Sequence, residues 1–172
     1  MLQNEIVKDR EHTTMEKRPN ESVIGKNDSI VAILNTHVEA EEAVKELQKA
    51  GFDMKKLSIV ARNYRGGFWG LLFGSAFFVV PGIGPILVGG PLVVWIIGAL
   101  EGAAIVGGLS AVGAALYSLG IPKDTILKYE SFLEINKFLV VAHGTTEQID
   151  RARDILRGAG SVETNVHRGG HL

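Results

Sequence analysis

Cysteine is absent from this 172-residue chain, which excludes disulfide bonds, thiolate metal sites and cysteine nucleophiles. Neither sign of charge is in excess, because 18 basic and 19 acidic residues give a net charge of −1. Such a chain has no global field to attract nucleic acid, and it lacks a basic patch with interleaved aromatics, so we expect no nucleic-acid partner. It also lacks paired acids, a Ser–His–Asp arrangement and a phosphate-binding glycine motif. We therefore expect no enzyme, no cofactor and no metal site.

The N-terminal segment, residues 1–28, has no apolar core of the kind that a signal peptide needs. Its charges are mixed, and we expect it to be a flexible polar tail. The rest of the chain is accordingly expected on the cytoplasmic side. A second short tail is expected over residues 168–172.

Two segments of the chain share an order of features at a constant offset of 109 residues. Each opens with a β-branched, apolar run typical of a strand, continues with a helix that begins at a capping box, and stops at an Ala-Gly pair before a second strand. The helix starts are Thr36 with Glu39 and Thr145 with Gln148, and the stops are Ala50-Gly51 and Ala159-Gly160.

These two βαβ halves, residues 29–65 and 121–167, predict an α+β fold. Units of this size commonly join into a four-stranded antiparallel sheet with two helices on one face, the ferredoxin-like split βαβ arrangement. A linking helix over residues 122–136 begins at Pro122, which suits a first helical turn.

A Gly-rich hydrophobic segment, residues 66–120, interrupts the two halves and carries a single charge, Glu101. A membrane-spanning helix needs about 20 apolar residues, so the segment has room for two. The stretch "PGIGPILVGGP" (81–91) would break a continuous helix. Since both ends must return to one sheet, and positive residues flank the segment, we expect a helical hairpin embedded in the membrane from the cytoplasmic side.

Small residues recur every fourth position in this segment, which lets helix backbones approach closely in lipid. We expect them to mediate helix packing and self-association. The glycines concerned are Gly66, Gly70, Gly74, Gly98, Gly102 and Gly107.

Glu101 is a candidate buried acid, because a carboxylate inside an apolar span is costly and is usually paired, protonated or functional. An ion path would be one such function. The alternative is that Glu101 marks the end of a helical segment near the interface.

The order of motifs resembles a known family. A unit of the type "VAILNTHVEAEEAVKELQKAGF…KLSIVAR" is followed by a hydrophobic stretch with "PGIGP" at its centre, then "LGIPKD…YE", then a second βαβ unit. This is similar to the bacterial heat-induced general stress protein family and related uncharacterised proteins, over roughly residues 29–167. The resemblance implies a bacterial, stress-associated, membrane-associated protein without catalytic residues.

A candidate ligand site is expected where the first strands of the two halves end. If these strands are parallel neighbours, two helix N-termini point at one place, which is a possible anion site. The residues brought together would be Asn35, Thr36, His37, His143, Thr145 and Thr146. The alternative is that the threonines only cap helices and the histidines are solvated. His167 and His171 are expected in a frayed tail.

Together these features predict a non-enzymatic stress-associated protein that is anchored in the inner (cytoplasmic) membrane by its hairpin and self-associates through it. Its partners would be the lipid bilayer and further copies of itself. One alternative is a cytoplasmic homo-oligomeric scaffold or shell that buries the hairpins between subunits. Another is a small-molecule sensor that uses the end of the sheet near the histidines.

Overall fold

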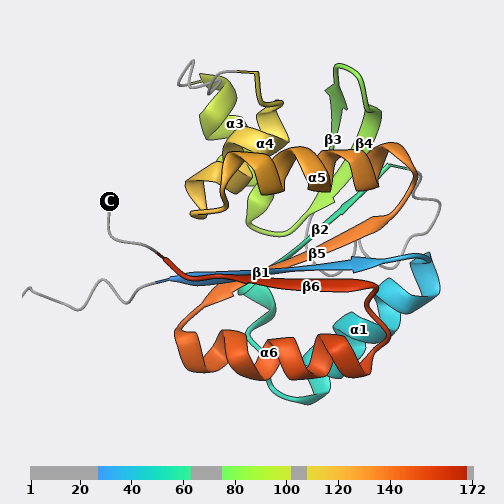
Figure 1. Ribbon diagram of the computed structural model, residues 1–172, viewed down its shortest axis with the longest axis vertical. Helices are drawn as coiled ribbons and strands as arrows, with labels where there is room; N and C mark the ends of the chain where they lie inside the picture. Colours follow the sequence, from blue (N-terminus) through green and yellow to red (C-terminus); the bar gives the residue numbers. More distant parts are fainter. Residues whose placement is uncertain (1–26, 63–74, 102–107, 170–172) are drawn as a thin grey trace, which may run out of the picture.

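A six-stranded sheet forms the middle layer of the protein, which the computed structural model describes over residues 27–62, 75–101 and 108–169 (Figure 1). The strand order is β3-β4-β2-β5-β1-β6, and every neighbouring pair is antiparallel. The strands are β1 (Asp28–Leu34), β2 (Leu57–Ala61), β3 (Ser75–Val80), β4 (Gly84–Gly89), β5 (Phe138–Gly144) and β6 (Glu163–His167).

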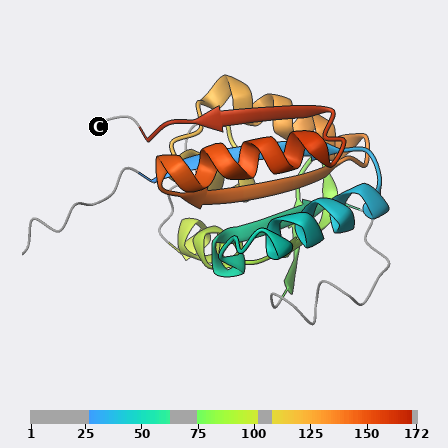
Figure 2. The ribbon, with the colours of Figure 1, turned by 90° about the horizontal axis from the view of Figure 1, so that it is seen from below.

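Helices cover both faces of this sheet, so the expected α+β class is confirmed (Figures 1 and 2). The helices α1 and α6 lie on one face, and α3, α4 and α5 lie on the other. The bounds are α1 (His37–Lys49), α3 (Leu92–Glu101), α4 (Ala111–Ser118), α5 (Lys123–Glu134) and α6 (Thr146–Gly158), with a short 3-10 turn over Met54–Lys56.

The local signals of the two halves are confirmed. Thr36 and Thr145 are the N-caps of α1 and α6, and both capping boxes are complete. Gly51 and Gly160 follow the helix ends with φ of 77° and 85°, a left-handed conformation that glycine adopts without steric cost. The linking helix starts where expected, with Pro122 as its N-cap.

Two apolar cores lie on the two faces of the sheet, because successive side chains of a strand point to opposite sides. In β5, for example, Val140 and Ala142 pack under α1 and α6, whereas Leu139 and Val141 pack under the other three helices. The central strands β1 and β5 are therefore apolar on both faces.

The second core explains why the membrane prediction is wrong. No described helix is long and apolar enough to cross a bilayer. The described part of the hydrophobic segment is not a helical hairpin but the β3–β4 hairpin followed by α3 and α4. Its apolar side chains contribute to the core on the face of the sheet that α1 and α6 leave open, and they include Ile86, Val88, Leu92, Ile96, Val112 and Leu116.

One glycine of the expected packing rows, Gly98, lies within the described residues. Gly98 is exposed on α3, and a Cβ built there meets nothing within 4 Å, so the described residues show no close helix contact at this position. The other glycines of the expected rows, Gly66, Gly70, Gly74, Gly102 and Gly107, lie outside the described residues.

Glu101 is not a buried acid. It is exposed as the last residue of α3, which agrees with the alternative that it marks the end of a helical segment. Among the described residues, no helix around this carboxylate is a membrane span, which was the premise of a functional role.

The two expected tails differ in outcome. The N-terminal tail falls almost wholly on residues outside the described part of the chain, although Asp28 belongs to β1. Of the C-terminal tail, Arg168 and Gly169 are bound to Asp28, and His167 is part of β6, so this end is not frayed up to residue 169. His171 lies outside the described residues.

Candidate functional site

The expected ligand site is divided between two ends of the sheet. Strands β1 and β5 are neighbours, but they run antiparallel, with Leu34 opposite Phe138 and Asp28 opposite Gly144. The C-terminal ends of these two strands therefore lie at opposite ends of the sheet, and the expectation of parallel neighbours was wrong. One end of the sheet holds Asn35, Thr36 and His37, and the other end holds His143, Thr145 and Thr146.

The polar groups near Asn35, Thr36 and His37 stabilise the start of α1. The carboxylate of Glu39 accepts hydrogen bonds from the backbone N–H of Asn35 at 2.8 Å and of Thr36 at 3.2 Å. The side chain of Asn35 accepts a bond from Lys137. His37 lies 3.2 Å from Glu41 and packs edge-on against Phe138. Thr36 caps a helix, as the alternative interpretation held, but His37 is partly buried against these neighbours rather than fully solvated.

At the other end of the sheet, near Thr145 and Thr146, the central residue is Asp28, an acid that was not among the predicted site residues. Asp28 is only 1% exposed, and its carboxylate accepts bonds from Arg168 at 2.7 Å, from the hydroxyl of Thr146 at 2.7 Å and from the N–H of Gly169 at 2.9 Å. Burial alone would raise the pKa of Asp28, but these three donors outweigh it and lower the pKa. The only sequence signal was an acid directly before an apolar strand.

His143 lies on the face of β5 that α3 covers, in alternation with Leu139 and Val141. Its ring centroid is 5.1 Å from that of Trp95 in α3. Burial lowers the pKa of His143, and the charge of Lys56 lowers it further, against smaller opposite effects of Asp53 and of a hydrogen bond to the Lys56 backbone. The imidazole is therefore neutral near pH 7.

A groove of about 610 Å³ opens beside this ring pair. The rings of Trp95, Tyr117 and His143 line it, together with residues 118–122 between α4 and α5. The hydroxyl of Ser29 in β1 donates to the carbonyl of Leu119 at 3.3 Å, which ties this loop to the sheet. Of the groove, sequence reasoning found only His143, because the two other rings come from a segment that was read as membrane hairpin.

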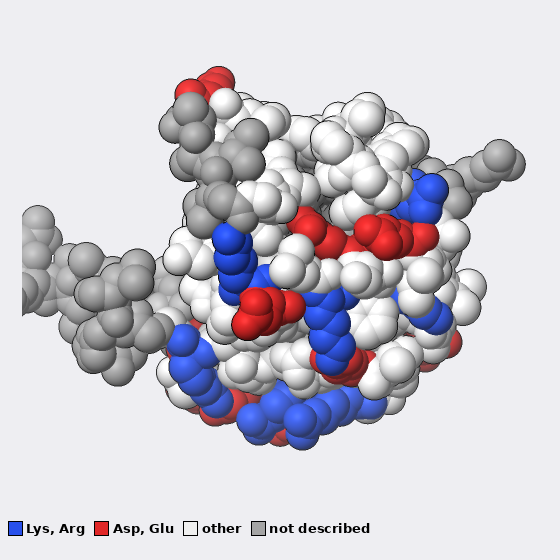
Figure 3. Space-filling view, turned by 45° about the horizontal axis from the view of Figure 1, so that its top comes forward, with Lys and Arg blue, Asp and Glu red and all other residues white. Residues whose placement is uncertain are grey.

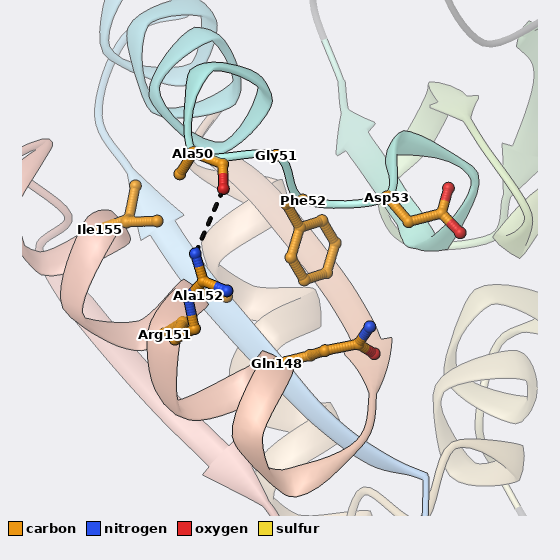
Figure 4. A pocket seen from close by; sticks show the side chains of 8 residues that line it. All are labelled: Ala50, Gly51, Phe52, Asp53, Gln148, Arg151, Ala152 and Ile155. Carbon is orange, nitrogen blue, oxygen red and sulfur yellow. Dashed lines mark hydrogen bonds between the residues drawn. The ribbon is translucent and has the colours of Figure 1, made fainter.

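A smaller depression of about 100 Å³ lies between the end of α1 and α6 (Figure 4). Arg151 donates to the carbonyl of Ala50 at 3.4 Å there, which satisfies a free backbone group at the C-terminus of α1. The side chain of Gln148 is used in the capping box of α6 and accepts a bond from Lys56. Because these polar groups serve the structure, we regard the larger groove as the candidate ligand site.

A hydrogen-bonded pair joins α5 to the edge strand β6. The hydroxyl of Tyr129 lies 2.9 Å from Nε2 of His167. Burial raises the pKa of Tyr129 to about 12 and lowers the pKa of His167. The phenol and the imidazole are therefore both uncharged near pH 7 and share this hydrogen bond, which ties the partly buried His167 to the core residue Tyr129. No cluster of metal-ligating side chains is found among the residues that the structure describes.

A second candidate surface is strand β3, which lies at the side of the described sheet opposite to β6. The side chains of Phe77 and Val79 are 75% and 81% exposed. Charged side chains occupy the middle and lower parts of Figure 3, whereas the region over the β3–β4 hairpin is white. Between Ser75 and Glu101 the sequence has no other charged residue than Glu101 itself.

Comparison with known proteins adds no relative to this description. No family model, no curated protein and no solved structure matches the chain. The groove and the edge strand β3 are therefore the two features from which a function can be inferred.

Proposed function

We propose that this protein is a non-enzymatic, self-associating module whose copies join through the edge strand β3 to form a homo-oligomeric scaffold. The observation that carries the proposal is that β3, the outermost strand among the described residues, has an uncharged, apolar surface at Phe77 and Val79. An exposed apolar edge of this kind is a template for pairing with another chain, which natural proteins normally block.

The register of the β3–β4 hairpin indicates which backbone groups of β3 face outward. Val79 is opposite Pro85, which has no N–H, so this pair occupies a non-hydrogen-bonded position of the ladder. Hydrogen-bonded and non-hydrogen-bonded positions alternate along an antiparallel pair. Phe77, two residues before Val79, is therefore also in a non-hydrogen-bonded position. The N–H and C=O groups of Phe77 and Val79 therefore point away from β4 and are available to a strand of a second copy.

Charge favours a second copy over other partners at this edge. In a two-fold symmetric dimer the same patch of both copies forms the contact. A charged residue in this patch would therefore lie near a residue of the same charge in the second copy. Strand β3 (SAFFVV) has no ionisable side chain, and antiparallel pairing about a two-fold axis would set apolar side chains against one another.

The other edge of the sheet shows the protection that β3 lacks. Glu163 on β6 pairs with Lys128 of α5 at 2.7 Å, which places a charged residue on this edge strand. Charged residues on an edge strand discourage the addition of a further strand. Association is therefore expected through β3 and not through β6.

Sedimentation velocity of the wild type and of Val79→Lys tests the proposal. We expect an oligomer for the wild type and a shift to the monomer for the variant, since the two-fold contact would bring two lysines together. Val38→Lys is the matched control, because Val38 is 68% exposed on α1, on the other side of the sheet from α3. A monomeric wild type, or an oligomer that survives Val79→Lys, would overturn the proposal.

A proline variant separates backbone pairing from side-chain contact. Val79→Pro removes an N–H that faces outward, so the bonds between β3 and β4 should persist and the monomer should keep its fold. We expect this variant, too, to be monomeric with an unchanged circular dichroism spectrum. An oligomer that tolerates proline would show that the contact uses side chains only and that strand pairing is wrong.

The finer identity of the fold and a cellular role belong to the same proposal. The order β2-β5-β1-β6 with α1 and α6 on one face supports a ferredoxin-like arrangement of the two halves. The motif resemblance described above supports a role in the stress response, and the cysteine-free composition fits a cytoplasmic location. An increase in the protein level of the native host after a heat shock, measured by immunoblot, is the expected result, and a constant level would contradict the stress role.

A further inference from the structure

We infer that two copies of the protein pair across a two-fold axis at Phe78, so that Phe77 of each copy faces Val79 of the other. This inference rests on the proposed self-association and adds to it the register of the contact. The two β3 strands run antiparallel and join the sheets of both copies into one continuous sheet. All residues concerned belong to the described strand β3 (Ser75–Val80).

The outward-facing backbone groups of β3 allow only some registers. Val79 is opposite Pro85 in a non-hydrogen-bonded position, and such positions recur at every second residue, so the N–H and C=O groups of Ser75, Phe77 and Val79 point away from β4. A new antiparallel ladder forms where the outward-facing groups of the two copies lie opposite each other. A register shifted by one residue would set them against inward-facing groups. The two-fold axis therefore passes at a residue of β3 and not between two residues.

The side chains of β3 alternate between the two faces of the sheet, and both sets are apolar. Val80 is buried in the core beneath α3, α4 and α5, and Phe78 packs against this core. Phe77 and Val79 point to the other face and are exposed. Side chains that lie directly opposite each other on neighbouring strands contact one another. The most stable register therefore places apolar side chains opposite each other on both faces.

An axis at Phe78 meets this requirement for every pair. It places Phe77 opposite Val79, Ala76 opposite Val80, and Phe78 opposite its own copy, and all of these residues lie within β3. An aromatic ring opposite a β-branched side chain is a favourable cross-strand pair. The pair of Phe77 and Val79 occurs twice, because the contact is symmetric.

The neighbouring registers leave one of the two exposed side chains without an apolar partner in the strand. An axis at Phe77 would place the hydroxyl of Ser75 opposite Val79. An axis at Val79 would place Phe77 opposite Pro81, in the turn that follows β3. An axis nearer the start of β3 would leave Val79 without a partner in the strand. The axis at Phe78 is therefore favoured.

The absence of cysteine makes single-thiol variants a direct test of the register. Phe77→Cys and Val79→Cys replace exposed side chains, so the monomer should keep its fold. The Cα atoms of a hydrogen-bonded antiparallel pair are about 5.5 Å apart, which a disulfide can bridge, whereas diagonal neighbours at about 7–8 Å are beyond its reach. With the axis at Phe78, residue 77 lies opposite residue 79 of the second copy and only diagonal to residue 77.

Oxidation of an equal mixture of Phe77→Cys and Val79→Cys should therefore give mainly the mixed disulfide dimer, which intact mass spectrometry identifies. Each variant alone should link no faster than Val38→Cys, the control at a residue of α1 that is 68% exposed. Rapid linkage of Phe77→Cys alone or of Val79→Cys alone would place the axis at that residue and overturn the inference. A mixed dimer at no more than the level of random pairing would overturn it as well.

Phe78→Cys gives a second measurement on the other face of the sheet. Residue 78 faces its own copy in a non-hydrogen-bonded pair, with Cα atoms about 4.5 Å apart, so this variant should link by itself. If Phe78→Cys does not fold, the mixture of the two exposed-site variants decides alone.

Sedimentation velocity of the wild type separates failure of the register from failure of the proposed function. An oligomeric wild type that Val79→Lys dissociates, together with no linkage in the mixture or in Phe78→Cys, would overturn the register and leave self-association through β3 intact. A monomeric wild type would overturn the proposed function and the register with it.

Discussion

The carboxylate of Asp28 and the guanidinium of Arg168 lie 2.7 Å apart and connect the first residue of β1 to the residue that follows β6. Arg168 also binds Asp150 of α6 at 2.6 Å. A buried acid is stable only when such donors compensate its lost hydration. This contact therefore fixes the C-terminal end of the described chain to the sheet, where the sequence analysis expected a free tail.

Replacement of this acid by its amide should destabilise the fold. Asp28→Asn loses the charge that strengthens three hydrogen bonds, and we expect a loss of about 2 kcal/mol in the free energy of unfolding at pH 7. Urea denaturation measures it. Asp154→Asn is the control, because Asp154 is 73% exposed in its pair with Arg153, and it should change stability by less than about 0.5 kcal/mol.

The same variant predicts a pH dependence. The folded state lowers the pKa of Asp28, so the stabilisation is present above the unfolded pKa near 3.8 and is lost as the pH falls through the folded value. The stability difference between the wild type and Asp28→Asn should therefore shrink from pH 7 to pH 3. A difference that stays constant over this range would show that the ionised carboxylate is not what stabilises the contact.

Tyr129 should titrate later than an ordinary phenol. Its pKa of about 12 means that the difference between the ultraviolet titrations of the wild type and Tyr129→Phe is a step near pH 12. Since the folded pKa is raised above the unfolded value near 10, the stabilisation is present below pH 10 and is lost above it. Tyr129→Phe should cost about 1 kcal/mol at pH 7, because the bond to His167 is removed. A step near pH 10 would contradict burial of this hydroxyl.

Acid should destabilise the protein through two histidines. The pKa values of His143 and His167 are both lowered from 6.5, mainly by burial. Their neutral forms stabilise the fold above pH 6.5, and this contribution is lost as the pH falls through the folded values. Lys56 and Asp53 act on His143, and Tyr129 faces His167.

Thermal unfolding between pH 7.5 and pH 5 measures this effect. The melting temperature of the wild type should fall across this range, and that of the double variant His143→Gln and His167→Gln should fall less. An equal slope in both proteins would show that other groups cause the acid sensitivity.

Two glycines of the hydrophobic segment should respond oppositely to alanine. Gly90 has φ of 88°, and a Cβ there would lie 2.1 Å from the carbonyl oxygen of Leu57, so Gly90→Ala should destabilise by at least about 3 kcal/mol. Gly98 is exposed on α3 with open space around its Cα, so Gly98→Ala should stabilise the helix by about 0.5–1 kcal/mol. Chemical denaturation of both variants compares them directly. A loss of stability in Gly98→Ala would support the close helix packing that the sequence analysis expected.

Local features of the sequence determined much of the secondary structure. The capping boxes at Thr36 and Thr145 and the glycines after α1 and α6 depend only on neighbouring backbone groups, and they were predicted correctly. The β-branched, apolar runs also identified the strands of both halves. These signals act within one or two turns, so the chain carries them without its tertiary context.

Relations between distant segments were decided by the tertiary structure alone. The sequence does not state that β1 and β5 run antiparallel, and this direction separates His37 from His143 by the length of the strands. It also does not state what an apolar segment packs against. The composition of an apolar segment does not show whether it packs against lipid or against a sheet, because burial of apolar surface is non-directional.

The fate of the hydrophobic segment follows from the sheet. Its two faces both carry apolar residues, such as Ile33 on one side and Ala32 on the other, so a second layer was required. The sequence by itself determined the helix ends, the strand pattern and the absence of charge between Ser75 and Leu100. Only the fold decided that Ile86, Val88 and Ile96 join the core on one face of the sheet, that Phe77 and Val79 stay exposed, and that Trp95 contacts His143. These outcomes depend on which distant surfaces come into contact.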